Sequence, residues 1–512
     1  MTSARLEIHI INVSQGDSLL IIHRDLGKVR AAIEAKLKTP PTDPIDYVPF
    51  ALRSGVPLTG TVVRALLVDG GDSSYGDDVV RMLIRQGVVT VPGYYPNLSM
   101  MVSHFHADHL AGLNSVLLDK DVPKKPKGKS RTVPRFVPGV IYVNPLYDKT
   151  TVPKNKLFPA FRETLEDVSL KLPTGKRATI VEVLPGGLDP KTKKPLVIEL
   201  GDGVADEDGK AIPITVRMVA SGQGVYREKF NDVVAVPPKG SKNAVDMNDR
   251  SLCFVLSYGS FRFFSGGDIA GDGRAAGGNV STNAMPDPPK GKGAKYKGKK
   301  KNKKIGSSHS HGDVEKVLGP AMQENFPATK LLTGYVRGAD KFPHAGHCTV
   351  MKASHHASAS SVDTYFLSEV RPYVIAISCG FRARAHDHPT QQVLDRIDNV
   401  KTARWGLRGT TREIDNTVEG LYLTEVVKKR RTRDYTTNVR SGKLLGDIVI
   451  RPTDESIVAL RTTTETGKRV KVQVYGTTER TDTTDTENEL FPNTAGSGDA
   501  NYPIGPFYHP LI

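Results

Sequence analysis

Three histidines and one aspartate fall within residues 104–109: His104, His106, Asp108 and His109. Imidazole nitrogens and carboxylate oxygens are the usual protein ligands of zinc and similar divalent metals. In an extended segment His104, His106 and Asp108 would share one side, and His109 would follow at a turn into a helix. One short loop could therefore supply two adjacent metal ions. We expect one or two divalent metals, with Zn²⁺ as the first expectation and Mn²⁺ as the alternative.

Basic residues gather in three segments of the chain. Lysine and arginine number 71 against 55 aspartates and glutamates, a net charge of +16. Residues 124–131, 290–304 and 428–433 carry five, nine and five basic residues without an acidic one, so the remainder sums to about −3. Localised positive charge favours polyanions. We expect nucleic acid to bind through these basic loops, although solubilising or targeting loops would have the same composition. The candidate contacts are Lys297, Lys299, Lys300 and Lys301.

The composition excludes several classes of protein. The chain has 512 residues, of which 38% are hydrophobic and 25% are charged, as in ordinary globular proteins. No run approaches the roughly 18 apolar residues of a membrane span, and the first residues lack the pattern of a secretory signal. Three scattered cysteines (Cys253, Cys348 and Cys379) are too few for a disulfide framework. We expect a cytoplasmic protein, and the sequence leaves its oligomeric state open.

Short strands and helices alternate along the chain and must position the histidines. Apolar runs predict strands at 6–23 (two strands around a turn at 15–17), 63–68, 252–257, 261–264, 349–354, 373–378 and 446–450. Helical periodicity and terminal signals predict helices at 77–85, 109–118 and 364–370. This alternation predicts an α/β fold.

The motifs resemble, in order along the chain, those of the metallo-β-lactamase fold superfamily and of its ComEC-like (DNA-internalisation competence) branch. Residues 104–109 resemble the HxHxDH signature. The further matches are NVSQGDS at 12–18 to VGQGDS, LVDGG at 67–71 to LLVDGG, 248–256 with 264–268 to NxxSLVL…FLFTGD, KASHHAS at 352–358 to LKVxHHGS, and 379–389 to SVG…GHP. The resemblance spans roughly residues 6–400 and implies a four-layer αββα sandwich with metals at one edge of the sheets.

The resemblance also implies a domain organisation. Residues 1–460 would form the hydrolase domain, and residues 461–512 a C-terminal extension that is partly disordered. Residues 24–62, which contain prolines and look irregular, and about 120–250 would be insertions. Residues 271–312, rich in Gly, Pro and Lys, would be a disordered basic loop.

Metal-ligand roles follow from the resemblance. The first metal would take His104 and His106. The second would take Asp108, His109 and one of two paired histidines, with Asp268 bridging both ions. Among the pair, His356 is preferred because it precedes a small residue, and His355 is the alternative. Asp108 and Asp268 are also the candidate catalytic residues, because each could accept a proton while acting as a ligand.

Three further residues are candidates for supporting roles. Asp69 ends a buried strand before two glycines and would orient a metal-bound imidazole, or simply cap the turn. Lys352 would reach the substrate or lie at a sheet edge, and His388 would contact the active site or shape a turn. No histidine lies between His109 and Asp268, where many superfamily members have a metal ligand. One tight metal with a second, weak one is therefore an alternative to a full two-metal site.

The chemistry expected from such a site is hydrolysis. A divalent metal lowers the pKa of bound water from 15.7 to about 7, which supplies a metal-bound hydroxide at neutral pH. The basic segments and the branch resemblance favour a phosphodiesterase or nuclease acting on nucleic acid. Two alternatives stay open: a hydrolase of a small metabolite of lactone, thioester or β-lactam type, and a nucleic-acid-binding protein whose metal site is structural or decayed.

Overall fold

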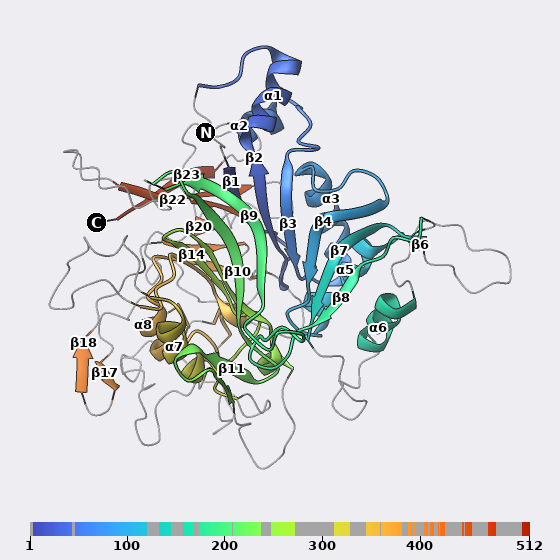
Figure 1. Cartoon of the computed structure of the whole chain (residues 1–512). Helices are drawn as coiled ribbons and strands as arrows, with labels where there is room; N and C mark the ends of the chain where they lie inside the picture. Colours follow the sequence, from blue (N-terminus) through green and yellow to red (C-terminus); the bar gives the residue numbers. More distant parts are fainter. Residues whose placement is uncertain are drawn as a thin grey trace, which may run out of the picture.

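The apolar runs form two mixed β-sheets that pack face to face in the computed structural model of the protein (Figure 1). The α/β class predicted from the sequence is confirmed. The structure describes residues 4–42, 47–119, 133–144, 157–167, 172, 174–206, 208–236, 247–271, 312–327, 345–358, 360–380, 388–390, 393–394, 397, 404–407, 410–413, 418, 420–424, 443–444, 446–452, 469–477 and 504–511.

The first sheet has the strand order β23-β22-β21-β1-β2-β3-β4-β7-β8. Its strands are β1 (Ala4–Ile10), β2 (Leu19–Asp25), β3 (Val62–Val68), β4 (Gly93–Met101), β7 (Phe136–Val143), β8 (Thr179–Glu182), β21 (Asp447–Pro452), β22 (Arg469–Thr477) and β23 (Ile504–Leu511). β3, β4, β7 and β8 run parallel. Their carboxyl ends therefore meet at one edge, where Asp69 follows β3 and His104 follows β4.

The second sheet has the order β12-β11-β10-β13-β14-β15-β16-β19-β20, with β9 paired to β10. Its strands are β9 (Val197–Ala205), β10 (Ala211–Ser221), β11 (Gly224–Arg227), β12 (Asp232–Ala235), β13 (Cys253–Tyr258), β14 (Phe261–Ser265), β15 (Val350–Lys352), β16 (Val374–Ile377), β19 (Gly420–Leu423) and β20 (Lys443–Leu444). β14, β15 and β16 are parallel, so Asp268 and the paired histidines also follow carboxyl ends at one edge.

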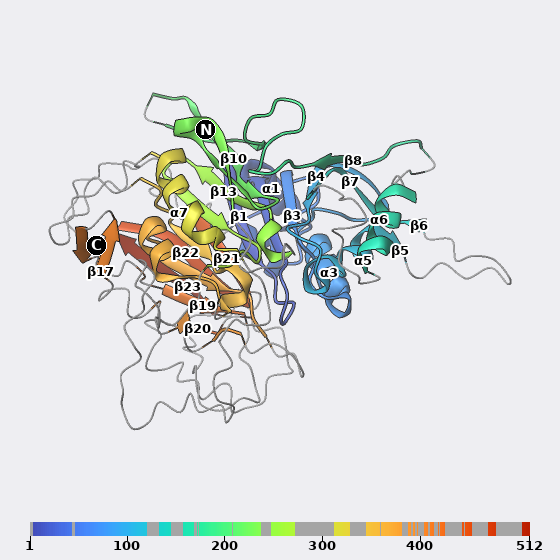
Figure 2. The ribbon, with the colours of Figure 1, turned by 90° about the horizontal axis from the view of Figure 1, so that it is seen from below.

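Helices lie on the outer faces of both sheets. The described α-helices are α1 (Leu26–Leu37), α2 (Tyr47–Arg53), α3 (Gly76–Arg85), α4 (Ala107–Leu110), α5 (Leu113–Leu117), α6 (Leu157–Asp167), α7 (Val314–Asn325) and α8 (Thr364–Val370). Apolar residues of α3, α5 and α6 pack on the first sheet, and those of α7 and α8 pack on the second. Figure 2 shows α3 and α7 on opposite sides of the strands.

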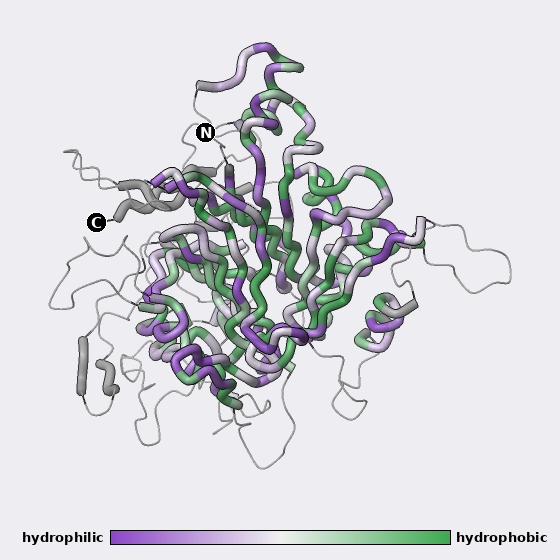
Figure 3. The backbone as a smooth tube through the Cα atoms, in the orientation of Figure 1, coloured by the Kyte–Doolittle hydropathy of each residue, from purple (hydrophilic) through white to green (hydrophobic). Residues whose placement is uncertain are grey.

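The core between the sheets follows from the period-2 alternation of the strands. In β3, Leu66 and Val68 face the second sheet, whereas Leu67 faces the helices. In β16, Val374 faces the first sheet and Ile375 faces α7 and α8. Hydrophobic residues accordingly run along the strands in the middle of the molecule (Figure 3).

Two expected insertions contain more regular structure than predicted. Residues 24–62 are not irregular in their described part, because α1 and α2 form a cluster of their own around Val29 and Val48. Residues 120–250 include β7 and β10, which lie inside the two sheets. Both strands contain a proline, Pro138 in β7 and Pro213 in β10. Proline has low strand propensity, so the sequence alone did not predict these strands. A register shift beside Pro213 accommodates it.

The C-terminal extension contributes β22 and β23, which continue the first sheet beyond β21. Two short strand pairs stand apart from both sheets: β5 (Leu118–Asp119) with β6 (Val133–Pro134), and β17 (Arg404–Leu407) with β18 (Thr410–Glu413). Within the part of the chain that the structure describes, no helix has the length and apolar character needed to span a membrane.

Candidate metal centre

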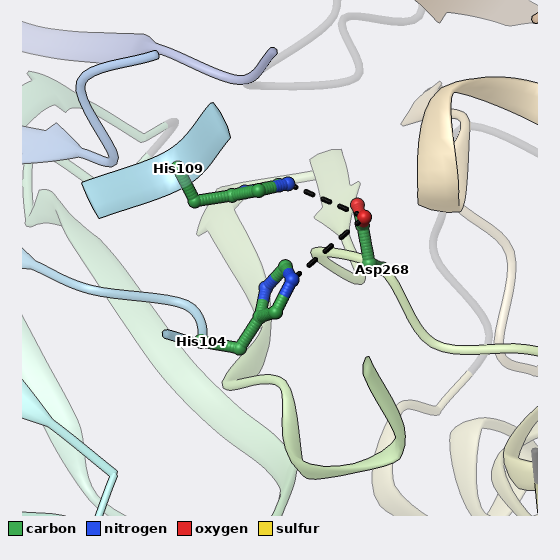
Figure 4. A group of neighbouring side chains, drawn as sticks. All are labelled: His104, His109 and Asp268. Atoms are coloured by element: carbon green, nitrogen blue, oxygen red, sulfur yellow. Dashed lines mark ion pairs between the residues drawn. The ribbon is translucent and has the colours of Figure 1, made fainter. Parts of the chain in front are cut away.

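Imidazole and carboxylate groups from both sheets converge around the side chain of Asp268. Its Oδ2 atom lies 3.3 Å from His109 Nε2 and 3.8 Å from His104 Nε2 (Figure 4). The same oxygen lies 3.7 Å from His356 Nε2 and 3.8 Å from His355 Nε2. Residues far apart in the sequence therefore surround one buried carboxylate.

Three overlapping groups of described residues could hold a metal ion, each with ligand atoms within 4.8 Å of one another. They are His104, His109 and Asp268; Asp108, His109 and His356; and Asp17, Asp69 and His109. His109 belongs to all three groups, and Asp108 Oδ2 lies 3.9 Å from His356 Nε2. The structure thus has histidine and aspartate groups that could hold a metal ion, as the sequence predicts.

His106 lies beside these groups and belongs to none of the three. It precedes α4, is half-buried, and its Nδ1 lies 3.0 Å from His104 Nε2. The predicted segment 104–109 therefore forms a continuous cluster of rings at the end of β4.

The buried atoms of the cluster fit a divalent metal. Among the described residues, His109 Nε2, His356 Nε2 and Asp268 Oδ1 have no hydrogen-bond partner. An unpartnered buried polar group costs about 1–3 kcal/mol, which a bound cation would offset. The opposite ring nitrogens have neighbours: His109 Nδ1 lies 2.8 Å from Asp69 Oδ2, and His356 Nδ1 lies 3.0 Å from the Ser378 carbonyl. Metal-binding histidines are commonly held in this way by their second nitrogen.

Asp69 has an unusual backbone conformation that places its carboxylate behind His109. Its φ of 59° is left-handed, which non-glycine residues rarely adopt. The carboxylate accepts hydrogen bonds from the Ser103 amide at 2.7 Å and from the Ser103 hydroxyl at 2.5 Å. Asp69 therefore fixes both the backbone at Ser103, where the histidine loop begins, and the imidazole of His109.

The single helix predicted over 109–118 is broken into α4 and α5. The helical hydrogen bonds are interrupted because backbone groups here pair with neighbouring loops, and the Asp108 carbonyl accepts from the Asp17 amide at 3.1 Å. A Cβ on Gly112 would lie only 1.8 Å from the Gly70 carbonyl oxygen, so glycine permits the close packing. The Gly112 amide donates to the Gly71 carbonyl at 2.9 Å, and the Gly70 amide donates to the His109 carbonyl at 2.7 Å. These contacts clamp the histidine loop onto the turn that carries Asp69.

The paired histidines lie in a strained turn after β15. His355, His356 and Ala357 have φ values of 48°, 50° and 59°, all left-handed. Such a conformation costs roughly 1–2 kcal/mol per residue and clusters at functional sites. His356 is 1% exposed and His355 is 16% exposed. His355 Nε2 also lies 3.4 Å from the side-chain nitrogen of Asn248.

Burial and mutual charge perturb the titration of the cluster. Burial and the neighbouring His109 hold the pKa of His104 well below its usual value. Burial also lowers the pKa of His109, but Asp268 and Asp69 outweigh it and hold that pKa well above its usual value. Burial raises the pKa of Asp268 and of Asp108, but the neighbouring imidazoles outweigh it and lower both. Both carboxylates are therefore ionised at neutral pH.

The remaining predicted residues lie close to this centre. Lys352 is buried and its Nζ donates a hydrogen bond to Asp17 Oδ2, so it does not lie at an exposed sheet edge. The His388 ring lies 5.5 Å from that of His355 and 6.3 Å from that of His356, measured between centroids. Asp17 had no predicted role, although its position at the turn between two buried strands marked it as a carboxylate near the sheet edge.

The lysine candidates and all three basic segments lie outside the described residues. The ends that flank residues 272–311 are described, and they meet beside the cluster. The Val314 amide donates to the Ala270 carbonyl at 2.9 Å, two residues after Asp268. The Gly312 amide donates to the side chain of Asp249.

Comparison with known proteins does not identify a family. No protein-family profile matches the chain, and no curated protein shows significant similarity to it. The function is therefore argued from the geometry of the candidate metal centre.

Proposed function

We propose that the protein is a metal-dependent hydrolase of the metallo-β-lactamase fold that acts as a phosphodiesterase on nucleic acid. The observation that carries the proposal is the convergence of His104, His109, His355 and His356 on the buried Asp268 carboxylate. Helices packed on the outer faces of two facing sheets support the four-layer αββα assignment.

The residues of the centre would have separate roles in metal binding. His104 and His106 would hold one ion, Asp108, His109 and His356 a second, and Asp268 would lie between them. Bound divalent metals would supply Lewis-acid activation of water and of the phosphoryl group. Asp69 would keep the His109 ring in place through its 2.8 Å contact.

Asp108 is the carboxylate that we propose as the proton acceptor. Its side chain is 18% exposed, against 4% for Asp268, so it lies on the open side of the cluster. Its lowered pKa keeps it ionised at neutral pH. Asp108 would therefore accept a proton at its carboxylate, whereas Asp268 would serve to join the two ligand groups.

Nucleic acid is the proposed substrate because of where the lysine-rich segment joins the fold. Residues 290–304 hold nine lysines, and the described ends of the surrounding segment meet two residues from Asp268. Lysine contacts to phosphates would supply affinity that falls steeply with salt.

The test is hydrolysis by metal-loaded protein. We expect cleavage of plasmid, single-stranded DNA or RNA with Zn²⁺ or Mn²⁺, and a loss of at least about 100-fold in Asp268→Ala. Asp78→Ala, which alters an exposed ion pair of α3, is the matched control and should stay active. Hydrolysis of a lactone, thioester or β-lactam without cleavage of nucleic acid would favour the small-metabolite alternative. Fewer than about one bound ion per chain in the wild type would favour a decayed site.

Removing residues 290–304 tests the substrate assignment separately. The deletion should weaken nucleic-acid binding and reduce the salt dependence of the affinity, because nine lysines are lost. Equal affinity and equal salt dependence in the deleted protein would remove the charge argument and leave the metal centre untouched.

A further inference from the structure

We propose that Asp17 and Lys352 form a buried charged pair whose carboxylate positions the His356 imidazole for metal binding. The proposal rests on the proposed function and extends it to two residues that the proposed function does not use as metal ligands. Both are positioning residues, since they would act through His356.

The pair is enclosed and directly bonded. Lys352 Nζ donates a hydrogen bond to Asp17 Oδ2, and the side chains are 2% and 4% exposed. A buried carboxylate is costly unless it is paired, and the lysine provides the compensating charge. Lys352 also donates to the Ala353 carbonyl at 3.4 Å, which anchors its ammonium group at the end of β15.

The second oxygen of the carboxylate faces a histidine ring. Asp17 Oδ1 lies 3.4 Å from His356 Nδ1, and Asp17 Oδ2 lies 3.9 Å from His109 Nδ1. Oδ1 has no hydrogen-bond partner among the described residues, so its charge is directed toward the imidazole. A nearby anion favours the tautomer with the proton on Nδ1. That tautomer leaves the lone pair of Nε2 free for a metal.

Nε2 of His356 is the atom that points into the cluster. It lies 3.7 Å from Asp268 Oδ2 and 3.9 Å from Asp108 Oδ2. The Ser378 carbonyl, 3.0 Å from Nδ1, supports the same tautomer from a second direction. The Nδ1 side of the His356 ring therefore faces one backbone acceptor and one nearby carboxylate, while Nε2 faces the proposed ligands.

The loop that carries Asp17 also joins separate ligand-bearing segments. The Asp17 amide donates to the Asp108 carbonyl at 3.1 Å, and the Gly71 amide donates to the Asp17 carbonyl at 2.8 Å. The Ser378 hydroxyl donates to the Gly16 carbonyl at 2.9 Å. A Cβ on Gly16 would lie 2.6 Å from the Asp108 carbonyl oxygen, so glycine permits this approach. Asp17 and Lys352, 335 positions apart, thus link the ligands of the first sheet to those of the second.

The experiment compares Asp17→Asn, Lys352→Met and the double variant with the wild type. Zinc affinity is measured by competition with a chromophoric chelator, the ligand field by the absorption spectrum of the Co²⁺ form, and folding by denaturation of the metal-free protein. Lys352→Met should destabilise the metal-free protein, because it leaves the carboxylate buried without its cation. The double variant should recover that stability, because it removes both charges.

A positioning role predicts that zinc affinity does not recover with stability. We expect the double variant to bind zinc about 10–100-fold more weakly than the wild type, with an altered Co²⁺ spectrum. Glu324→Gln, which removes the Arg227–Glu324 ion pair, is the matched control and should retain wild-type affinity.

Two outcomes would overturn the positioning role of the pair, and only one of them would also overturn the hydrolase proposal. Wild-type zinc affinity and spectrum in the folded double variant would show that the pair is structural only, and would leave the hydrolase proposal intact. Absence of metal binding by the wild-type protein would overturn both proposals.

Discussion

At the scale of single residues, adjacent histidines have different surroundings. The His355 and His356 Nε2 atoms lie at nearly equal distances from Asp268 Oδ2, 3.8 and 3.7 Å. His356 has its second nitrogen beside a backbone carbonyl and belongs to a group of convergent ligand atoms. His355 is more exposed and lies beside Asn248 and His388. This difference favours His356 over His355 as the ligand in the proposed metal centre.

This difference predicts unequal effects of mutation. His356→Gln should weaken zinc binding by about 100-fold or more, because a ligand is lost, whereas His355→Gln should weaken it by less than about 10-fold. Chelator competition on both purified variants measures the ratio. A larger loss in His355→Gln would exchange the two assignments.

At the scale of elements, the helices behind the second sheet contain buried acids that are separate from the metal centre. Glu369 of α8 is 3% exposed and accepts a hydrogen bond from Gln323 of α7. Burial raises the pKa of Glu369 to about 7, although Arg371 and hydrogen bonds from Gln323 and Tyr365 oppose it. The packing of α7 on α8 therefore favours a protonated carboxyl group.

The raised pKa predicts a pH-dependent stability. The folded protein binds this proton more tightly than the unfolded chain does. The stabilisation is therefore complete below the ordinary pKa of 4.5 and is lost as the pH rises through about 7. Glu369→Gln, which mimics the protonated group, should gain up to about 3 kcal/mol over the wild type between these limits. Urea denaturation from pH 4.5 to 8 measures the difference. The exposed Glu34→Gln variant should show a constant difference, and a constant difference for Glu369→Gln would contradict the assignment.

At the scale of the whole molecule, the candidate metal ligands come from both sheets. The histidine loop follows β4 of the first sheet, whereas Asp268 and the paired histidines follow β14 and β15 of the second. A metal held by both sets would join the sheets at their common edge. Metal binding should therefore contribute to the stability of the folded chain as a whole.

Metal removal tests this coupling. A ligand at 100 times its Kd adds about 2.7 kcal/mol, so for a chain of 512 residues EDTA should lower the midpoint of thermal unfolding by about 2–3 °C and Zn²⁺ should restore it. Calorimetry of the wild type and Asp268→Ala measures the effect, and the variant should show little response. An unchanged midpoint in the chelated wild type would contradict a metal that joins the two sheets.

Local patterns were sufficient for the elements whose residues alternate without interruption. The strands at 63–68 and 261–264 and the helix at 77–85 were predicted close to β3, β14 and α3. The histidine loop was also predicted, because its ligand types and spacing lie within six residues. These features could be predicted because the periodicity of apolar residues and the spacing of the histidines are both visible within a short stretch of sequence.

Tertiary structure decided the rest. β7 and β10 form despite internal prolines, because neighbouring strands pair with them and packing overrides local propensity. The break between α4 and α5 depends on backbone hydrogen bonds from this segment to the Asp17 loop and to the glycine turn after β3. The pairing of Asp17 with Lys352 joins positions 335 residues apart, and a sequence does not display which distant charges will be buried together. The amino-acid sequence by itself determined the ligand types and most strands around the centre, whereas the convergence on Asp268 arises only when two sheets bring their carboxyl ends to one edge.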